Sequence, residues 1–124
     1  MAAIKRGSLT ALPTERPFPG VTRASFSSEH ATLASYRFEP GARFPLHSHP
    51  QEQITLVEEG EVEVTIAGST LSMQPGDWAI APADVEHGLV AGPNGARVIA
   101  IVVPRRGHAD EYTFADRREV GDER

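Results

Sequence analysis

The sequence predicts an all-β fold in a single domain, and three observations lead to that prediction. Eleven glycines and ten prolines divide the 124 residues into short segments that are rich in β-branched and apolar residues. No sustained 3.6-residue periodicity precedes the C-terminal tail. The length suits one domain and is too short for two. We therefore expect about eight to ten short strands, joined by tight turns and packed as a sandwich, jelly roll or small barrel.

Alternating apolar residues mark the individual strands. Val62, Val64 and Ile66 alternate with glutamate and threonine, so one face of this strand is expected to be buried and the other wet. Glycine-rich turns separate the strands, and Gly92–Gly95 is expected to be one of them. The expected strands are Val21–Phe26, Ala31–Phe38, Ile54–Gly60, Glu61–Ile66, Thr70–Met73, Trp78–Ala81, Leu89–Ala91 and Arg97–Val103.

The two ends of the chain differ from the strand-rich middle. Residues 115–124 are mostly charged, and we expect a flexible, solvated tail after a barrel domain that spans residues 1–114. The apolar segment Leu9–Phe18 is expected to form an N-terminal strand extension that pairs with a partner's sheet, so a homodimer is predicted. Several large apolar residues are expected in the core: Phe38, Met73, Trp78, Ile99 and Ile101.

Composition excludes several classes of function. The formal net charge is −5 and no basic patch with interleaved aromatic residues is present, so we expect no nucleic-acid partner. No run of about 18 apolar residues exists that could cross a membrane, and the N-terminus lacks the apolar run of a secretion signal. The chain has no cysteine, so a metal site must use nitrogen and oxygen ligands, and a cytoplasmic location is expected.

A small set of polar residues has the spacing of a metal site. His47 and His49 are two residues apart and would project from the same face of an extended strand. Gln53 keeps that parity, whereas Glu52 has the opposite parity and should point away. His87 is distant in sequence, but a neighbouring strand of a closed barrel can bring it to the same place. Three imidazoles and an amide oxygen suit one divalent Mn, Fe, Co, Ni, Cu or Zn ion.

The spacing around the first pair of histidines resembles the first motif of the cupin superfamily. That motif contains a glycine, five residues, His-x-His, three or four residues, a glutamate, six residues and a second glycine. Here Gly41 is followed by five residues and then His47 and His49. Gln53 stands where glutamate is usual, and Gly60 follows after six residues.

A second stretch is similar to the second cupin motif. Gly76 is followed by five residues and then by Pro82, and two residues separate Asp84 from His87. Asp84 replaces the usual glycine, and Ala91 replaces the usual asparagine, but neither departure affects a ligand. The two motifs, at residues 41–60 and 76–87, imply a small single-domain cupin jelly-roll barrel. They also imply that one divalent metal ion is held by four residues: His47, His49, Gln53 and His87.

The resemblance implies a range of activities. Gln53 makes every protein ligand neutral, so the ion keeps its full +2 charge, which favours an anionic substrate. The chain resembles small cupins of pectin and alginate breakdown that act on unsaturated monouronates, although no carboxylate base is evident. We therefore expect a metal-dependent isomerase or lyase acting on a small, oxygen-rich anion. An iron- or copper-dependent dioxygenase and a non-enzymatic small-molecule-binding cupin are the alternatives.

The catalytic residues are not identified by the sequence, but three side chains are candidates for substrate contact. Arg43 shares the parity of His47, so it can face the barrel mouth and grip a substrate carboxylate. Tyr36 and Arg37 are neighbours on an expected strand beside the mouth. Because successive side chains of a strand point to opposite faces, one of these two should point inward.

Overall fold

The computed structural model describes residues 3–107 and 112–114, so the expected tail over 115–124 lies outside the described residues. The described chain is almost entirely β, with one short 3₁₀ turn and no helix that is long and apolar enough to cross a membrane. In chain order the elements are η1 (Leu9–Ala11), β1 (Glu15–Phe18), β2 (Val21–Ser27), β3 (Thr32–Phe38), β4 (Arg43–Ser48), β5 (Glu52–Ile66), β6 (Ser69–Met73), β7 (Trp78–Ala81), β8 (His87–Val103) and β9 (Thr113–Phe114).

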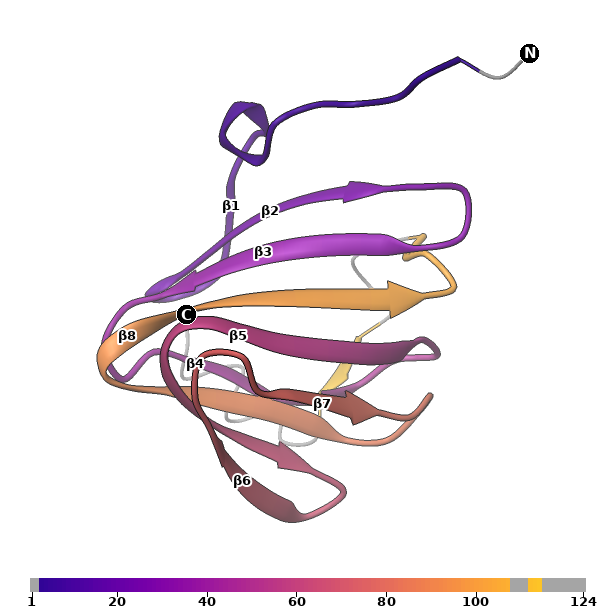
Figure 1. The fold of residues 1–124 in the computed structure, drawn as a ribbon. Coiled ribbons are helices and arrows are strands. Elements are labelled where there is room, and N and C mark those ends of the chain that lie inside the picture. Colours follow the sequence, from indigo (N-terminus) through magenta and orange to yellow (C-terminus); the bar gives the residue numbers. More distant parts are fainter. Residues whose placement is uncertain (1–2, 108–111, 115–124) are drawn as a thin grey trace.

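The strands form a curled sheet in which β8 is the central element (Figure 1). Strand β8 pairs antiparallel with β3, β4 and β5, while β5 also pairs with β6 and β7. The path β1-β2-β3-β8-β4-β9 completes the wall. Every pairing is antiparallel, which is the arrangement of a jelly-roll barrel and confirms the predicted fold class.

Two strands are longer than the sequence predicts, because they bend where turns or breaks were expected. Strand β8 continues through Gly92–Gly95, and β5 continues through Gly60. Both Gly60 and Gly95 have a φ of +75°. A Cβ on Gly60 would lie 2.0 Å from the carbonyl oxygen of Gly95, so the two bends fit together only without side chains. The paired strands therefore bend jointly, and the predicted turn at 92–95 is corrected to a bend.

The inward faces of these strands make up the core. Aromatic and aliphatic side chains meet there, and Phe18 of β1 packs edge-on against Phe44 with ring centroids 4.8 Å apart. Phe38 and Met73 are buried, as expected. Strand β1 pairs with β2 of its own chain, so Phe18 contributes to the core of its own barrel.

The outward face of β3, β8, β5 and β7 is unusually apolar. The strand register places Leu33, Ile101, Ile54 and Ile80 in one cross-strand row, and Ile99, Leu56 and Trp78 in the next. Trp78 is 65% exposed, and Ile99 and Ile101 are only half-buried. The expectation that these three residues belong to the core is therefore wrong. Their inward neighbours, Ala79, Val98 and Ala100, occupy the core instead, because side chains alternate along a strand.

The contact between the two bends predicts a large difference between two glycine substitutions. Gly60→Ala should lower the free energy of unfolding by about 3 kcal/mol, because it adds a clash to the left-handed backbone. Gly41→Ala is the matched control, since Gly41 has a φ of +73° but no atom lies within 4 Å of the position a Cβ would take. It should lose only about 1 kcal/mol. Urea unfolding measures both values, and equal losses would contradict the role of the bend contact.

We propose that the chain forms a homodimer in which a second copy covers the outward apolar face. Its five most exposed side chains leave on the order of 500 Å² of apolar surface in water, a large patch for a monomer. With its half-buried members and its rim, the face approaches the roughly 800 Å² that each partner contributes to a stable interface. No charged residue interrupts the two rows, so another copy of the same face is a suitable partner. Four of the five residues belong to this face, and the fifth, Phe26, extends the Leu33 row onto β2: Leu56, Trp78, Ile80, Val103 and Phe26.

The proposed dimer can be tested with the single tryptophan of the chain. Dilution should shift the emission of Trp78 to longer wavelength, and sedimentation should show twice the 13.4 kDa chain mass at high concentration. Ile80→Glu should give a monomer at all concentrations. Leu71→Glu, at a residue of similar exposure on β6, should leave the dimer intact. A monomeric wild-type protein would contradict the proposal.

Candidate metal centre

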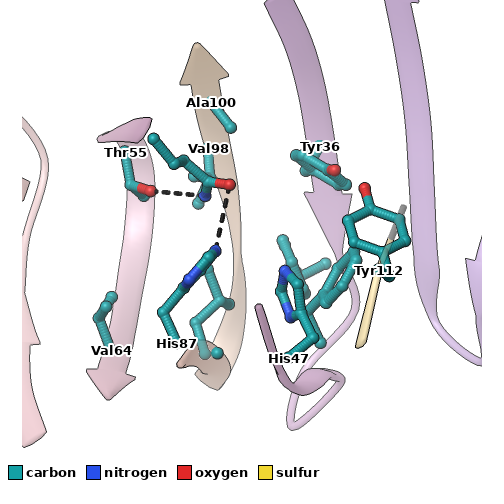
Figure 2. A pocket seen from close by; sticks show the side chains of 13 residues that line it. Tyr36, His47, Thr55, Val64, His87, Val98, Ala100 and Tyr112 are labelled. Carbon is teal, nitrogen blue, oxygen red and sulfur yellow. Dashed lines mark hydrogen bonds between the residues drawn. The ribbon is translucent and has the colours of Figure 1, made fainter. Parts of the chain in front are cut away.

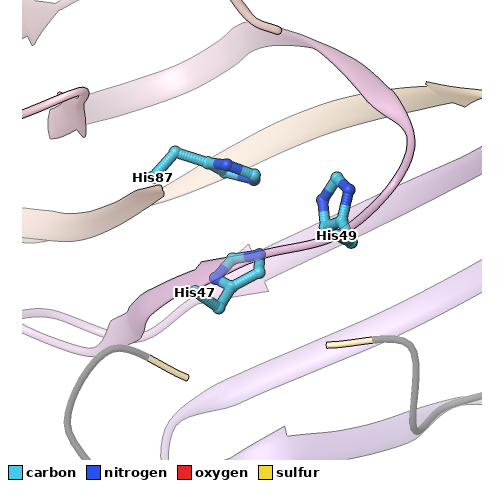
Figure 3. Close-up of side chains that lie close together, drawn as sticks. All are labelled: His47, His49 and His87. Carbon is cyan, nitrogen blue, oxygen red and sulfur yellow. The ribbon is translucent and has the colours of Figure 1, made fainter. Parts of the chain in front are cut away.

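Three strands bring the predicted ligands to one place inside the barrel. His47 is the penultimate residue of β4, His49 directly follows that strand, and His87 begins β8. Strand pairing sets His47 directly opposite His87, and their ring centroids are 4.4 Å apart. Figure 3 shows the three imidazoles turned toward a common point. One ligand atom from each lies within 4.8 Å of the others, so the three buried histidines can hold a metal ion.

Each of the three imidazoles is held by a hydrogen bond to a backbone carbonyl oxygen. A carbonyl oxygen can only accept, so the Nδ1 atom of each ring carries the proton and donates it. The Nε2 atoms therefore carry a lone pair and no proton, as in metal ligands whose second nitrogen is fixed by a hydrogen bond. The carbonyl partners of His47, His49 and His87 belong to Pro45 (2.8 Å), Gln51 (3.0 Å) and Val85 (2.9 Å), respectively.

Gln53 on β5 places a fourth lone-pair donor in the same space. Its Nε2 donates to Oγ1 of Thr55 at 3.0 Å, which turns Oε1 toward the histidines. That oxygen lies 3.1 Å from Nε2 of His49 and 3.2 Å from Nε2 of His87. With Nδ1 protonated, no proton lies between these atoms, and their lone pairs repel unless a cation separates them. Ligands bound at about 2.1 Å and at right angles lie about 3.0 Å apart, so the spacing fits a metal ion.

The surroundings favour the neutral form of two of the histidines, His47 and His87. Burial, reinforced by the nearby His87, lowers the pKa of His47 from 6.5 to about 3. Burial also lowers the pKa of His87. A neutral imidazole is the form that binds a metal, so both rings are ready to act as ligands at neutral pH.

A cavity of about 30 Å³ lies beside His47 and His87 (Figure 2). The volume suits one carboxylate group or a water molecule. Hydroxyl groups from Tyr36, Thr55 and Tyr112 line it together with apolar side chains. No aspartate or glutamate lines this cavity within the described part of the chain.

The structure separates the three candidates for substrate contact. Tyr36 is buried and lines the cavity, whereas its neighbour Arg37 is exposed on the outer face. Arg43 is exposed and does not line the cavity, contrary to the parity expectation. The pairing of β4 with β8 shifts register between Phe44 and His47, so parity is not preserved across that interval. Phe44, not Arg43, therefore lines the cavity with His47.

Two hydroxyl-bearing residues of the cavity were missed by the sequence analysis. Thr55 lies two residues beyond Gln53 on β5, so strand parity alone could have placed it inward. Tyr112 precedes β9, which pairs with β4 opposite His47 and so brings Tyr112 over the site. Its ring lies perpendicular to that of His47, with centroids 5.0 Å apart. The alternation of Tyr112 and Phe114 was a signal for a strand, but nothing in it indicates the partner strand.

Comparison with known proteins identifies the family. The chain matches the family described as "Cupin domain" over residues 34–103, which is more than half of its length. It therefore belongs to the cupin family, and the resemblance of the two motifs is confirmed.

One curated relative is the dimethylsulfoniopropionate lyase DddW of Ruegeria pomeroyi, which is 36% identical over 82 residues. The alignment covers 66% of this chain and 54% of that protein, so the chain spans about half the length of this relative. An RmlC-like cupin from Shewanella frigidimarina has a similar structure, with a TM-score of 0.77, 25% identity, and coverage of 87% of this chain and 96% of that one. KdgF from Halomonas sp. has a TM-score of 0.74 and 29% identity, covering 82% and 96%, respectively.

The ligand geometry predicts which substitutions remove a bound metal. His87→Ala should lose most of the metal after reconstitution with zinc, and the metal-dependent rise in melting temperature should disappear with it. Glu52→Gln is the control, since the exposed Glu52 lies next to Gln53 but points away from the site. It should retain wild-type metal content. Elemental analysis decides the outcome, and unchanged metal in His87→Ala would exclude this ligand set.

Proposed function

We propose that this cupin is a metal-dependent isomerase or lyase that acts on a small, oxygen-rich anionic substrate. The observation that carries the proposal is the neutral set of lone-pair donors. Three imidazole nitrogens and one amide oxygen converge, and no protein carboxylate offsets the charge of a bound divalent ion. The full +2 charge would favour an anionic ligand over a neutral one.

Different residues would have different roles within such a site. His47, His49, Gln53 and His87 would hold the ion, and the donor set suits Mn, Fe, Co, Ni, Cu or Zn. When bound, the ion supplies Lewis-acid polarisation of carboxylate and hydroxyl oxygens. The apolar side chains around the cavity exclude water, which strengthens electrostatic interactions with a bound anion.

The related proteins support this class of chemistry. DddW is named as a dimethylsulfoniopropionate lyase, and 36% identity over the matched region makes a lyase-type reaction a reasonable starting point. KdgF is similar in structure over nearly its whole length. Because cupin barrels carry many activities, the proposal rests on the site and takes only support from these relatives.

The experiment that tests the proposal measures turnover with and without dioxygen. Zinc-, manganese- and iron-loaded protein is incubated with dimethylsulfoniopropionate and with an unsaturated monouronate, in air and under argon. We expect turnover of a carboxylate substrate at equal rates in both atmospheres, and its loss in His87→Ala. Turnover that requires dioxygen would instead favour the dioxygenase alternative. Binding without turnover of either substrate would favour the non-enzymatic alternative, and either result would overturn the proposal.

Gln53→Glu provides a matched test of the charge argument. Glutamate should still hold the metal, because a carboxylate oxygen can replace the amide oxygen. It would also reduce the net charge of the site from +2 to +1, so carboxylate ligands should bind more weakly while metal content stays unchanged. Carboxylate titrations of the zinc-loaded proteins measure the effect.

A further inference from the structure

Two tyrosine hydroxyls meet at the wall of the cavity. Tyr36 comes from the inward face of β3, and Tyr112 precedes β9 at the other end of the described chain. Figure 2 shows their hydroxyl oxygens turned toward each other above His47. Both residues line the cavity, so their hydroxyls lie beside the space where a ligand of the metal would bind.

A buried arginine lies behind this tyrosine pair. Arg23 of β2 is only 5% exposed. Its guanidinium donates to the hydroxyl oxygen of Tyr112 at 3.3 Å and to that of Tyr36 at 3.5 Å, and its Nε donates to Glu15 at 3.0 Å. Burial of an arginine at an inward strand position costs free energy, and an apolar residue would normally be found there. Arg23 therefore places a positive charge at a position where the core alone does not require one.

The direction of these hydrogen bonds determines what the tyrosines can offer. A guanidinium group only donates, so each phenol oxygen acts as an acceptor toward Arg23. Arg106 also donates to the hydroxyl oxygen of Tyr112. The hydroxyl protons of the tyrosines are therefore not used by these arginines. If one proton bridges the pair, the other remains available to an acceptor in the cavity.

Burial and charge both suit an anionic acceptor. Tyr112 is a neutral phenol with a hydroxyl proton, so it can donate to an anion in the cavity. Arg23 and Arg106 add positive charge behind the hydroxyls. The Nε–H of Arg106 is itself buried and has no hydrogen-bond partner among the described residues. An unpaired buried donor of this kind is unfavourable, and a nearby anion or water would satisfy it.

We propose that Tyr36 and Tyr112 form a carboxylate-binding subsite next to the metal, with Arg23 as the residue that positions them. The ligand class is a small 2-hydroxycarboxylate, whose carboxylate would accept from the tyrosine pair and whose remaining oxygens would reach the ion. The cavity of about 30 Å³ has room for the carboxylate group of such a ligand. This inference rests on the proposed function for its anionic substrate, but it assigns recognition to residues that are not metal ligands.

Calorimetric titration of zinc-loaded protein with glycolate, the smallest 2-hydroxycarboxylate, tests the subsite without turnover. Tyr112→Phe and Tyr36→Phe keep the aromatic packing and remove only the hydroxyls. We expect at least one of them to weaken glycolate binding about tenfold or more, since a hydrogen bond to a charged group is lost. Glycolamide, the neutral analogue, should bind all three proteins about equally, and the zinc content should not change.

A double-mutant cycle separates positioning from general stability. Because Arg23 acts through the tyrosines, Arg23→Gln should weaken glycolate binding in the wild type but add little further loss in a Tyr36→Phe/Tyr112→Phe background. Arg97→Gln, at an exposed arginine paired with Glu59 far from the cavity, is the control and should have no effect.

Two results would overturn the subsite: no binding of glycolate by the zinc-loaded wild type, or equal glycolate affinity in the wild type and both phenylalanine variants. The titration does not depend on a reaction, so it distinguishes this inference from the proposed function. If turnover fails but the tyrosine-dependent affinity is present, the subsite is retained and the isomerase or lyase assignment is lost.

Discussion

Strand β8 pairs with three other strands along its length, and the geometry of the site depends on that pairing. Its first residue is His87, which the register sets opposite His47 of β4. The same strand runs beside β5, which carries Gln53. Backbone hydrogen bonds therefore determine the separation of ligands that are as much as 40 positions apart in sequence. Such a site is more precise than one built on mobile loops, because a ladder of backbone bonds must break before the ligands separate.

The local chemistry of the histidines complements this framework. Each ring is rotated by a hydrogen bond from Nδ1 to a carbonyl oxygen two residues away in the sequence. These bonds orient the opposite nitrogen inward before any ligand binds. The arrangement concentrates lone pairs in a buried space, which is unfavourable for folding on its own. Arrangements of this kind, which lower the stability of the fold, are characteristic of functional sites.

Strand alternation made much of the site predictable. His47, His49 and Gln53 share a face in the sequence pattern, and their side chains lie together in the structure, while Glu52 is exposed. The same rule failed for Arg43, because it assumes an unbroken register and the register shifts between Phe44 and His47. A shift of this kind depends on the partner strand, so the sequence of β4 alone does not reveal it.

Residues whose environment depends on distant partners were harder to predict. Trp78 was expected in the core because large aromatic residues are usually buried, but alternation with Ala79 and Ala81 places it outside. The small alanines occupy the inward positions, and reasoning from residue type alone does not predict that arrangement. Tyr112 reaches the cavity through the pairing of β9 with β4, which joins segments more than 60 residues apart. Local patterns contain no information about a contact of that range.

The pairing of β9 with β4 has a consequence for the order in which the site is assembled. The candidate metal ligands lie between residues 47 and 87, whereas the tyrosine pair is completed only by the C-terminal end of the described chain. During synthesis the ligand segments leave the ribosome first, and the short ladder of β9 forms last. Two backbone pairings are also a weak attachment compared with those of β5 and β8. The position of Tyr112 at the cavity therefore depends on a much shorter ladder than the positions of the candidate ligands do.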